Sequence, residues 1–255
     1  MTLDETNINQ AANLLLQAKH VIVFTGAGIS VSSGIPSFRG ENGIWNRYNP
    51  QVLELSNYYR NPEPCWKVIK EIFFDSMQDV KANPSHFAIT ELQKMGLVQN
   101  IFTQNIDNLH QAAGSDHVYE FHGNTRSFVC RKCKHKYDIS EVDLDAKYPL
   151  CLNCSGLLKP DFIFFSESLP SGVLEKAYQE AELADLVIIV GCSGEVFPAN
   201  QIPLIAKQCG AKIVDINPQS TLFSDQICDV KITAKSELAL PKLVETVKKL
   251  KGETV

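Results

Sequence analysis

The chain has 255 residues, of which 44 % are apolar and 21 % are charged, and its net charge is −5. This length and apolar content suit one large domain or two smaller ones, and the mildly acidic balance gives no sign of a nucleic-acid-binding surface. No apolar run reaches the ~20 residues needed to cross a bilayer, and the acidic N-terminus lacks the pattern of a signal peptide. We therefore expect a cytoplasmic monomer without direct contact to nucleic acid or membrane.

The first elements lead into a glycine turn. Apolar residues at helical spacing predict a helix over residues 7–18 with Thr6 as its N-cap, and the β-branched run 20–24 predicts a central parallel strand. In the turn that follows, Gly26 and Gly28 would let the backbone approach a phosphate and aim its N–H groups at it. A plain tight turn is the alternative, because Gly34 comes too late for the Gly-x-Gly-x-x-Gly pattern.

Residues 34–48 contain three glycines and a proline, which predicts a loop without regular structure. The loop carries Phe38, Arg39, Trp45 and Tyr48. Aromatic residues and an arginine beside a phosphate turn indicate a lid over a ligand. The alternative is an ordinary loop that its aromatic residues attach to the core.

Two helices are predicted next, over residues 62–80 and 84–95, and each begins with a proline. The strand predicted at 98–102 then delivers Gln104, Asn105 and Asp107 at its carboxyl end, where open α/β sheets bind ligands. These side chains can hydrogen-bond ribose hydroxyls and a carboxamide. Alternatively, Asp107 caps the helix that follows it.

Two histidines come after this cluster. His110 lies at helical spacing and is expected to be structural. His122 follows a strand predicted over residues 118–121 and precedes a glycine. A histidine at a strand end suits a general base, because its ordinary pKa lies near neutrality.

The eight cysteines fall into two groups. Two Cys-x-x-Cys pairs, separated by seventeen residues, have the spacing of a zinc ribbon: Cys130, Cys133, Cys151 and Cys154. Four thiolates leave no open position for water, so the zinc would be structural and would supply folding energy. The other four are expected to be small buried apolar residues: Cys65, Cys192, Cys209 and Cys228.

The C-terminal part alternates between strands and helices. Helices are predicted at 171–184, 199–209 and 237–250, and strands at 185–190, 211–216 and 229–233. A second close-approach turn occupies residues 191–194. Alternation of this kind predicts a parallel sheet with helices on both faces.

With these residues assembled, the chain resembles the sirtuin family of NAD-dependent protein deacylases, the silent information regulator type. The matching motifs are Gly-Ala-Gly-Ile-Ser at 26–30, Gly-Ile-Pro-Ser-Phe-Arg-Gly at 34–40, Thr-Gln-Asn-Ile-Asp at 103–107, His122-Gly123 and the four paired cysteines. The resemblance implies an α/β fold, a Rossmann-like parallel sheet with a smaller inserted zinc-ribbon plus helical module. It implies an NAD-binding domain over 1–36, 80–123 and 160–255, a lid loop and helical module over 37–79, and a zinc-ribbon module over 124–159.

The resemblance also implies roles for individual residues. One structural zinc would bind the four paired cysteines, and the catalytic residues would be His122, Asn105 and Asp107. NAD would be bound by Gly26, Ala27, Gly28, Ser30, Phe38, Arg39, Gln104, Asn105, Ile106, Asp107, Gly191, Ser193, Asn217 and Ser236. An extended peptide would pair with segments 162–167 and 195–197, through Phe162, Phe164, Phe165, Glu167, Val196 and Phe197.

The implied reaction removes the acetyl group from acetyl-lysine in proteins or peptides and releases nicotinamide and O-acetyl-ADP-ribose. The acyl oxygen attacks C1′ of the nicotinamide ribose, and His122 accepts a proton from the ribose diol. Ile69 and Ile72 stand where members that prefer succinyl- or malonyl-lysine have a tyrosine and an arginine. Apolar residues there argue for acetyl or longer aliphatic acyl groups, because a buried unpaired carboxylate is costly.

The sequence also departs from the family pattern and leaves alternatives open. Ser37 stands where many members have aspartate, and Gly194-Glu195 replaces a more apolar pair, which puts the local peptide preference in doubt. A protein ADP-ribosyltransferase would use the same cleft. A zinc-ribbon binding module with NAD as a sensed ligand is a second alternative, against which the intact His122 argues. A hydride-transfer dehydrogenase is a third alternative. It would need the Gly-x-Gly-x-x-Gly turn and an acidic residue that binds the ribose at the usual distance from it, and the sequence lacks both.

Overall fold

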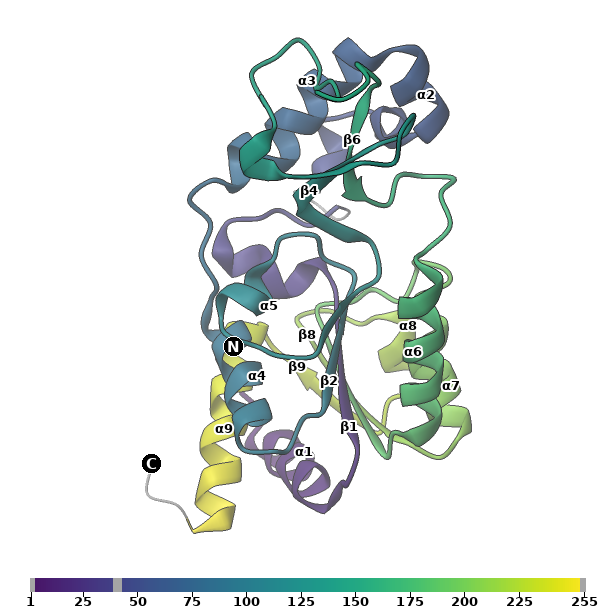
Figure 1. Cartoon of the computed structure of the whole chain (residues 1–255). Coiled ribbons are helices and arrows are strands. Elements are labelled where there is room, and N and C mark those ends of the chain that lie inside the picture. Colours follow the sequence, from purple (N-terminus) through teal and green to yellow (C-terminus); the bar gives the residue numbers. More distant parts are fainter. Residues whose placement is uncertain (1–2, 39–42, 253–255) are drawn as a thin grey trace.

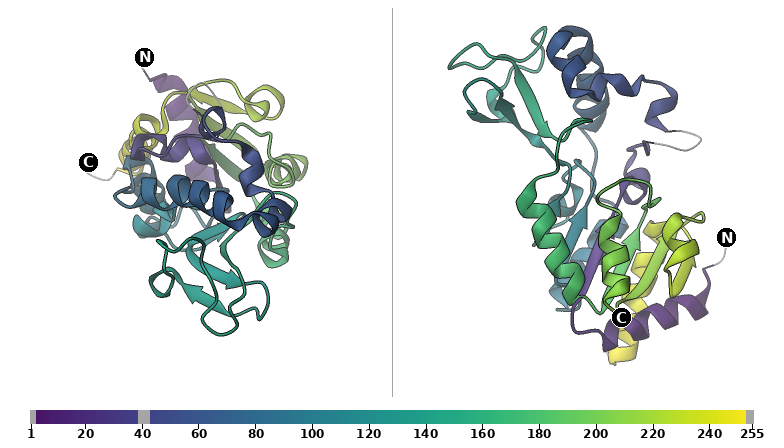
Figure 2. Two further views of the ribbon diagram at one scale, coloured as in Figure 1. Left: turned by 90° about the horizontal axis from the view of Figure 1, so that it is seen from above. Right: turned by 90° about the vertical axis from the view of Figure 1, so that its right-hand side faces the viewer.

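The computed structural model describes residues 3–38 and 43–252 (Figure 1). Within these ranges the chain forms a six-stranded parallel sheet with helices on both faces and a separate three-stranded antiparallel sheet. The two sheets lie toward opposite ends of the molecule (Figure 2). The predicted Rossmann-like parallel sheet with a smaller inserted module is confirmed.

The parallel sheet has the order β3-β2-β1-β7-β8-β9. Its strands are β1 Val21–Thr25, β2 Asn100–Thr103, β3 Val118–Glu120, β7 Leu186–Val190, β8 Lys212–Asn217 and β9 Val230–Thr233. Every residue of β1 and β7 is buried, because both strands are central and covered by helices on both faces. The chain leaves β1 toward β2 on one side and reaches β7 on the other. The carboxyl ends of β1 and β7 are therefore the topological switch point, where open α/β sheets bind ligands.

Helices cover both faces of this sheet. Side chains of α1 Glu5–Gln17, α4 Pro84–Lys94 and α9 Ser236–Lys251 share one apolar core, and those of α6 Ser171–Leu183 and α7 Gln201–Gln208 share the other. The predicted boundaries of these helices and of the sheet strands differ by no more than two residues. The expected Thr6 cap is wrong: the Asp4 carboxylate accepts the N–H groups of Thr6 and Asn7 and caps α1. No described helix is both long and apolar enough to span a membrane.

Two short helices complete this part of the fold. Helix α5 Leu109–Ala112 follows the polar loop after β2, and α8 Leu222–Gln226 follows β8. The first was expected, and the second was not predicted. Helix α8 has only five residues, too few to produce a helical pattern of apolar residues.

A third apolar core is formed by side chains of the antiparallel sheet and of two helices. Its sheet consists of β4 Gly123–Cys130, β5 Lys136–Asp138 and β6 Leu158–Phe162 in the order β5-β4-β6, and its helices are α2 Leu55–Arg60 and α3 Pro62–Phe73. The helix predicted over 62–80 is wrong in length, since α3 ends at Phe73 and a single 3-10 turn, Asp75–Met77, follows. The ring of Phe74 packs between Trp66 and Phe128, with centroids 5.5 Å from each, and this packing replaces another turn of helix.

The predicted absence of regular structure over residues 34–48 is also partly wrong. A 3-10 turn forms at Ile44–Asn46, and another follows at Pro50–Leu53. Arg39, one of the residues expected to bind NAD, lies outside the described residues.

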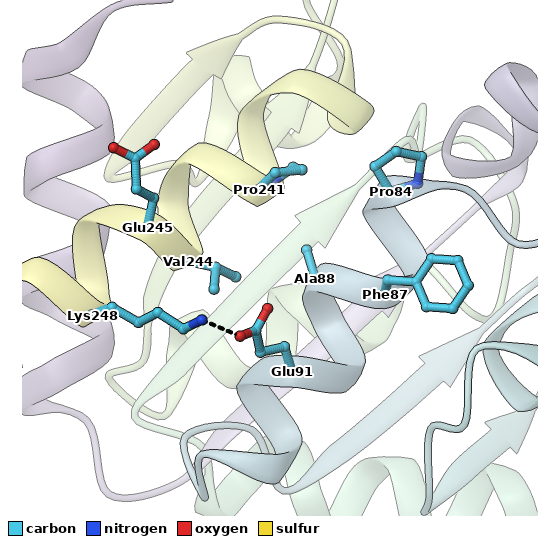
Figure 3. A pocket seen from close by; sticks show the side chains of 8 residues that line it. All are labelled: Pro84, Phe87, Ala88, Glu91, Pro241, Val244, Glu245 and Lys248. Carbon is cyan, nitrogen blue, oxygen red and sulfur yellow. Dashed lines mark ion pairs between the residues drawn. The ribbon is translucent and has the colours of Figure 1, made fainter. Parts of the chain in front are cut away.

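The helical layer that contains α4 and α9 has a groove of about 420 Å³ on its outer side (Figure 3). The ion pair between Glu91 and Lys248 crosses this groove. All of its lining residues come from the two helices, and none from a strand end. The groove is therefore separate from the switch point of the sheet.

Candidate active site

Two glycine turns meet at the switch point. The Gly26 N–H donates to the Val190 carbonyl at 3.1 Å, and the Gly28 N–H donates to the Gly191 carbonyl at 3.0 Å. A Cβ atom on Gly28 would lie 2.6 Å from the Gly191 Cα, so glycine is required because the turns touch each other. The N–H groups of Gly26 and Gly28 already have main-chain acceptors, so an amide that this turn offers to a phosphate would belong to another of its residues.

A compact polar cluster lies beside these turns. The Ser30 hydroxyl donates to the Asp107 carboxylate at 2.6 Å, and the Asn105 amide donates to the Ser30 hydroxyl at 3.1 Å and to the Gly26 carbonyl at 3.2 Å. Asp107 also accepts the N–H of Leu109, the first residue of α5, at 3.0 Å, although the N-cap position itself is occupied by Asn108. Burial raises the pKa of the Asp107 carboxyl, and the hydrogen bonds that it accepts oppose this rise. Two strand ends therefore present an amide, a hydroxyl and a carboxylate together.

His122 lies between β3 and β4 and is fixed in one tautomer. Its Nδ1 is 2.8 Å from the Gln104 carbonyl oxygen. A carbonyl only accepts hydrogen bonds, so in the neutral ring Nδ1 carries the proton and Nε2 is left to accept one. Burial lowers the pKa of His122, and the hydrogen bond to Gln104 opposes this. The ring is thus neutral near pH 7, as a general base must be.

The glycine after this histidine is required by sheet pairing. Gly123 has φ +70° and pairs with Phe162 of β6. A Cβ atom at this position would lie 2.1 Å from the Asp161 carbonyl oxygen. The His122-Gly123 motif therefore joins this histidine directly to the sheet that carries the paired cysteines.

Strand β4 also holds the polar loop after β2. The Thr125 hydroxyl donates to the Ile106 carbonyl at 3.1 Å and accepts the Asn108 amide at 2.9 Å. Asn108 has φ +63°, and its side-chain oxygen accepts a hydrogen bond from Arg126. Arg126 also forms an ion pair with Glu120 at 2.7 Å. These positioning contacts were not predicted, because a threonine and an arginine in a strand carry no local signal of a long-range partner.

The residues expected to hold the adenosine half of NAD follow β7 and β8. Gly191 and Ser193 lie in the turn after β7, and Asn217 is the last residue of β8. The Asn217 amide donates to the buried Asp215 carboxylate, which also accepts the Thr221 hydroxyl at 2.7 Å. Burial raises the pKa of Asp215. We did not predict Asp215 as part of this site, although an acidic residue within an otherwise apolar strand indicates a functional position.

Two other expected residues have mainly internal partners. Ser236 is buried at the start of α9 and accepts the Ser85 hydroxyl at 2.8 Å. The Phe38 ring packs on Trp45 and Phe73, with centroids 5.6 and 6.3 Å away. The aromatic residues of this loop therefore attach it to the third core, and its function as a lid stays a prediction.

His110 is structural, as expected. It is buried, with Nε2 3.0 Å from the Thr25 hydroxyl, and burial followed by the charge of His86 lowers its pKa to about 3. Such a ring stays neutral at any physiological pH, so it is no substitute for His122 as a base that exchanges protons.

The four paired cysteines form one cluster whose Sγ atoms all lie within 4.8 Å of one another. The Sγ distances are 3.5 Å for Cys130–Cys154 and 3.6 Å for Cys133–Cys151. A tetrahedral zinc with bonds of ~2.3 Å would separate its sulfur ligands by about 3.8 Å. The thiols therefore fit one structural zinc ion, as predicted.

The side chain of Tyr137 contacts this cysteine cluster. The Tyr137 hydroxyl is buried and lies 3.1 Å from the Cys151 Sγ. Although burial raises the pKa of Cys151, hydrogen bonds led by that of Tyr137 bring it down to about 6. Such a partner stabilises a thiolate ligand and fixes its direction.

Two of the other four cysteines depart from the expectation. Cys65 and Cys192 are buried as expected, but Cys228 is only partly buried and Cys209 is exposed. Cys209 follows the last residue of α7 and precedes Gly210, which has φ +103°.

The segment after β6, expected to pair with a peptide, has one edge already paired. The Ile163 N–H donates to the His122 carbonyl at 2.8 Å, and Phe165 exchanges hydrogen bonds with Leu53 and Leu55 at 2.8 and 3.3 Å. The rings of Phe162 and Phe164 are buried in the third core, so any contact they make with a peptide is through their backbone. The Phe165 and Phe197 side chains are 45 % and 75 % exposed.

Comparison with known proteins identifies the family. A family model described as "Sir2 family" matches residues 26–198, more than half of the chain. The chain therefore belongs to the Sir2 family, and the resemblance to sirtuins is confirmed.

Relatives match over almost their full length. The chain is 44 % identical to "NAD-dependent protein deacylase 2" of Archaeoglobus fulgidus, covering 98 % of this chain and 99 % of the relative. It is 41 % identical to "NAD-dependent protein deacetylase 1" of Pyrobaculum aerophilum, covering 96 % and 95 %. A solved Sir2 variant with a deacetylated p53 peptide and 3′-O-acetyl ADP ribose superposes with a TM-score of 0.88, at 35 % identity and covering 97 % and 99 %.

Proposed function

We propose that this chain is an NAD-dependent protein lysine deacetylase, which transfers the acetyl group of acetyl-lysine to ADP-ribose and releases nicotinamide. One observation carries the proposal. The neutral His122, with Nε2 as proton acceptor, is bonded to the loop that presents Asn105 and Asp107 at the switch point of the sheet. Membership of the Sir2 family and the names of the relatives support the same activity.

The chemistry follows from the side chains. Bound NAD would supply an electrophilic ribose carbon. Asn105 and Asp107 orient the nicotinamide carboxamide, and Ser30 holds the Asp107 carboxylate in place. His122 accepts a proton from the ribose diol at Nε2 and keeps its Nδ1–H on Gln104, so the ring does not rotate when it becomes charged. A positioned base of this kind contributes ~10²–10⁴-fold in rate.

We also propose that the chain is divided into an NAD-binding domain and two smaller modules. The NAD-binding domain comprises residues 1–36, 80–123 and 160–255, the lid and helical module 37–79, and the zinc-ribbon module 124–159. The third core, to which both modules contribute most of the residues, supports the separation of these modules from the NAD-binding domain. Gly191, Ser193 and Asn217 hold the adenosine half. The peptide runs along 162–167 and Val196–Phe197, for which the exposure of Phe165 and Phe197 is favourable.

The acyl group accepted is acetyl or a longer aliphatic chain. Ile69 and Ile72 of α3 are buried and belong to the third core together with Ile106. These side chains offer no partner for the carboxylate of a succinyl or malonyl group, which would be costly to bury alone. Deacylation of longer chains and ADP-ribosyl transfer to protein in the same cleft are the competing activities.

The test is to incubate the protein with NAD and acetyl-, succinyl- or myristoyl-lysine peptides and to identify the products by mass spectrometry. Nicotinamide and O-acetyl-ADP-ribose from the acetyl peptide are expected. ADP-ribose attached to protein without loss of acetyl would support the transferase instead. Nicotinamide release from none of the peptides would overturn the proposal.

We further propose that the enzyme acts as a monomer in the cytoplasm, on protein or peptide substrates, without binding nucleic acid or membrane. The net charge of −5 supports the last two points. Light scattering after size exclusion tests the monomer, since a mass near twice 28.4 kDa would contradict it.

A further inference from the structure

The Glu167 carboxylate, at the end of the segment that would pair with a peptide, has partners within the chain. Its Oε2 accepts the Phe164 N–H at 2.7 Å and lies 3.0 Å from the Nζ of Lys159. The side chains of Lys159 and Glu167 are only 12 % and 20 % exposed. This pair is therefore largely shielded from water, in contrast to ordinary surface ion pairs.

The Lys159 ammonium is also fully engaged. It donates to the carbonyls of Phe162 at 2.6 Å and Pro160 at 2.9 Å, so its three N–H donors face three acceptors. It lies 4.5 Å from the centroid of the Phe164 ring, within range for a cation–π contact. Loss of either charge would leave the other uncompensated in a shielded place, with a large effect on the local structure.

The pair connects two parts of the molecule. Lys159 belongs to β6, where it lies opposite Val129, and its neighbour Leu158 lies opposite the zinc ligand Cys130. Glu167 is the last residue of the segment 162–167, which also contains Ile163, whose N–H donates to the His122 carbonyl. The ion pair thus ties the far end of the segment back to the sheet that carries the zinc ligands.

The segment between the two charges needs such a restraint. Ser166 has φ +68°, a conformation that residues with a side chain rarely adopt. Its hydroxyl donates to the Glu54 carboxylate at 2.6 Å. A non-glycine residue in this conformation persists only where its surroundings hold it, and the adjacent Glu167 is held by Lys159.

We propose that the Lys159–Glu167 ion pair positions the acyl-lysine peptide by holding the turn at 164–167, in which the Glu167 N–H donates to the Phe164 carbonyl at 3.1 Å, and with it the segment 162–167 along which the peptide pairs. The inference rests on the proposed function and deepens it. Lys159 and Glu167 are positioning residues, which act through the backbone of the segment and not on the reacting atoms. Glu167 therefore contributes to substrate binding through its place in the chain, with its carboxylate turned to Lys159.

Four variants test this inference. Lys159→Met keeps the aliphatic stem and removes the charge, Glu167→Gln removes the opposite charge, and Lys159→Arg keeps the charge. Lys136→Met is the matched control, because Lys136 forms an exposed ion pair with Asp161 on the same sheet, at 2.7 Å. The measurements are the KM values for acetyl-lysine peptide and NAD, the affinity for a fluorescent acetyl-lysine peptide, and the zinc content.

Removal of either charge is expected to raise the peptide KM and Kd about tenfold, as for the loss of a hydrogen bond to a charged group. The NAD KM and the zinc content should not change. Lys159→Arg should stay within about threefold of the wild type, and Lys136→Met should match it. The double variant Lys159→Met/Glu167→Gln should be no worse than either single variant, because the two side chains act as a pair.

An unchanged peptide KM and Kd in Glu167→Gln, or an equal rise in both KM values, would overturn the inference and leave the pair a purely structural contact. If Lys159→Met does not fold, Glu167→Gln and Lys159→Arg decide. The binding measurement needs no turnover, so it separates the two proposals. A wild-type protein that binds the peptide but releases no nicotinamide refutes the proposed function alone, and one that does not bind the peptide refutes both.

Discussion

The imidazole of His122 and the backbone carbonyl of Gln104 are joined by a 2.8 Å hydrogen bond between residues 18 positions apart. This bond selects the tautomer of the ring and links it to the loop that carries Asn105 and Asp107. His122 and the polar cluster are therefore physically connected, so a substitution at either is expected to shift the position of the other.

His122→Ala should lower kcat by ~10²–10⁴-fold, since it removes the proposed proton acceptor. Its fold and zinc content should be retained, because the side chain has one hydrogen bond to the described residues and is partly exposed. Circular dichroism, zinc analysis and nicotinamide release check this. His117→Asn is the control, since His117 is exposed and has φ +50°, which asparagine tolerates. Near-normal deacetylation by His122→Ala would refute the assignment.

Gly28→Ala should separate the two glycine turns at the switch point. Its new methyl group would lie 2.6 Å from the Gly191 Cα, so the backbone must move. We expect a loss of about 1–3 kcal/mol in the free energy of unfolding and a raised KM for NAD. Urea unfolding and steady-state kinetics measure the two effects.

Gly172→Ala is the matched control for Gly28→Ala. Gly172 lies in α6, and a Cβ atom added there would meet no described atom within 4 Å. Alanine is the better helix former, so this variant should be at least as stable as the wild type, with unchanged kinetics. Equal stability of the two variants would contradict the role given to the contact between the turns.

Tyr137→Phe should weaken zinc binding without abolishing the fold. The change removes the hydroxyl that lies 3.1 Å from the Cys151 Sγ and leaves the buried ring in place. Loss of such a supporting partner typically costs ~10–100-fold in metal affinity. Competition with a chromophoric zinc chelator measures the affinity. Tyr148→Phe changes a second tyrosine that packs in the third core. It should leave the zinc affinity unchanged, and an equal loss there would contradict the prediction.

Two buried histidines should make stability depend on pH. Burial lowers the pKa of His86 to about 4, and His110 has a pKa of about 3. In the unfolded chain both take up protons near pH ~6.5. Stability is therefore full above this pH and is lost as the pH falls toward 4 and then 3, at about 1.4 kcal/mol per pH unit for each histidine.

The variant His110→Asn should have a shallower loss of stability between pH ~6 and ~5 than the wild type, by about 1.4 kcal/mol per pH unit. Urea unfolding at several pH values gives the slope. The exposed His117→Asn should retain the wild-type slope. Identical slopes for His110→Asn and the wild type would show that this buried ring does not contribute to the linkage.

The sequence alone was sufficient for the parallel α/β fold, the zinc cluster and the polar loop after β2. Apolar periodicity and the Cys-x-x-Cys spacing are local patterns, and the rule that ligands bind at strand ends places Asn105 and Asp107 once the strand is recognised. The family motifs then connected these parts into one expected site.

Other features were decided only by the tertiary structure. The contact of Gly28 with Gly191, the tautomer of His122 and the ion pair of Lys159 with Glu167 each join residues that neither periodicity nor motif spacing relates. The end of α3 at Phe73 was mispredicted because Phe74 packs on the ring of Phe128, which is distant in the chain. The physical reason is common to all of them: a local pattern records which face of an element is apolar, whereas the atoms that meet across the fold depend on packing between elements distant in the chain.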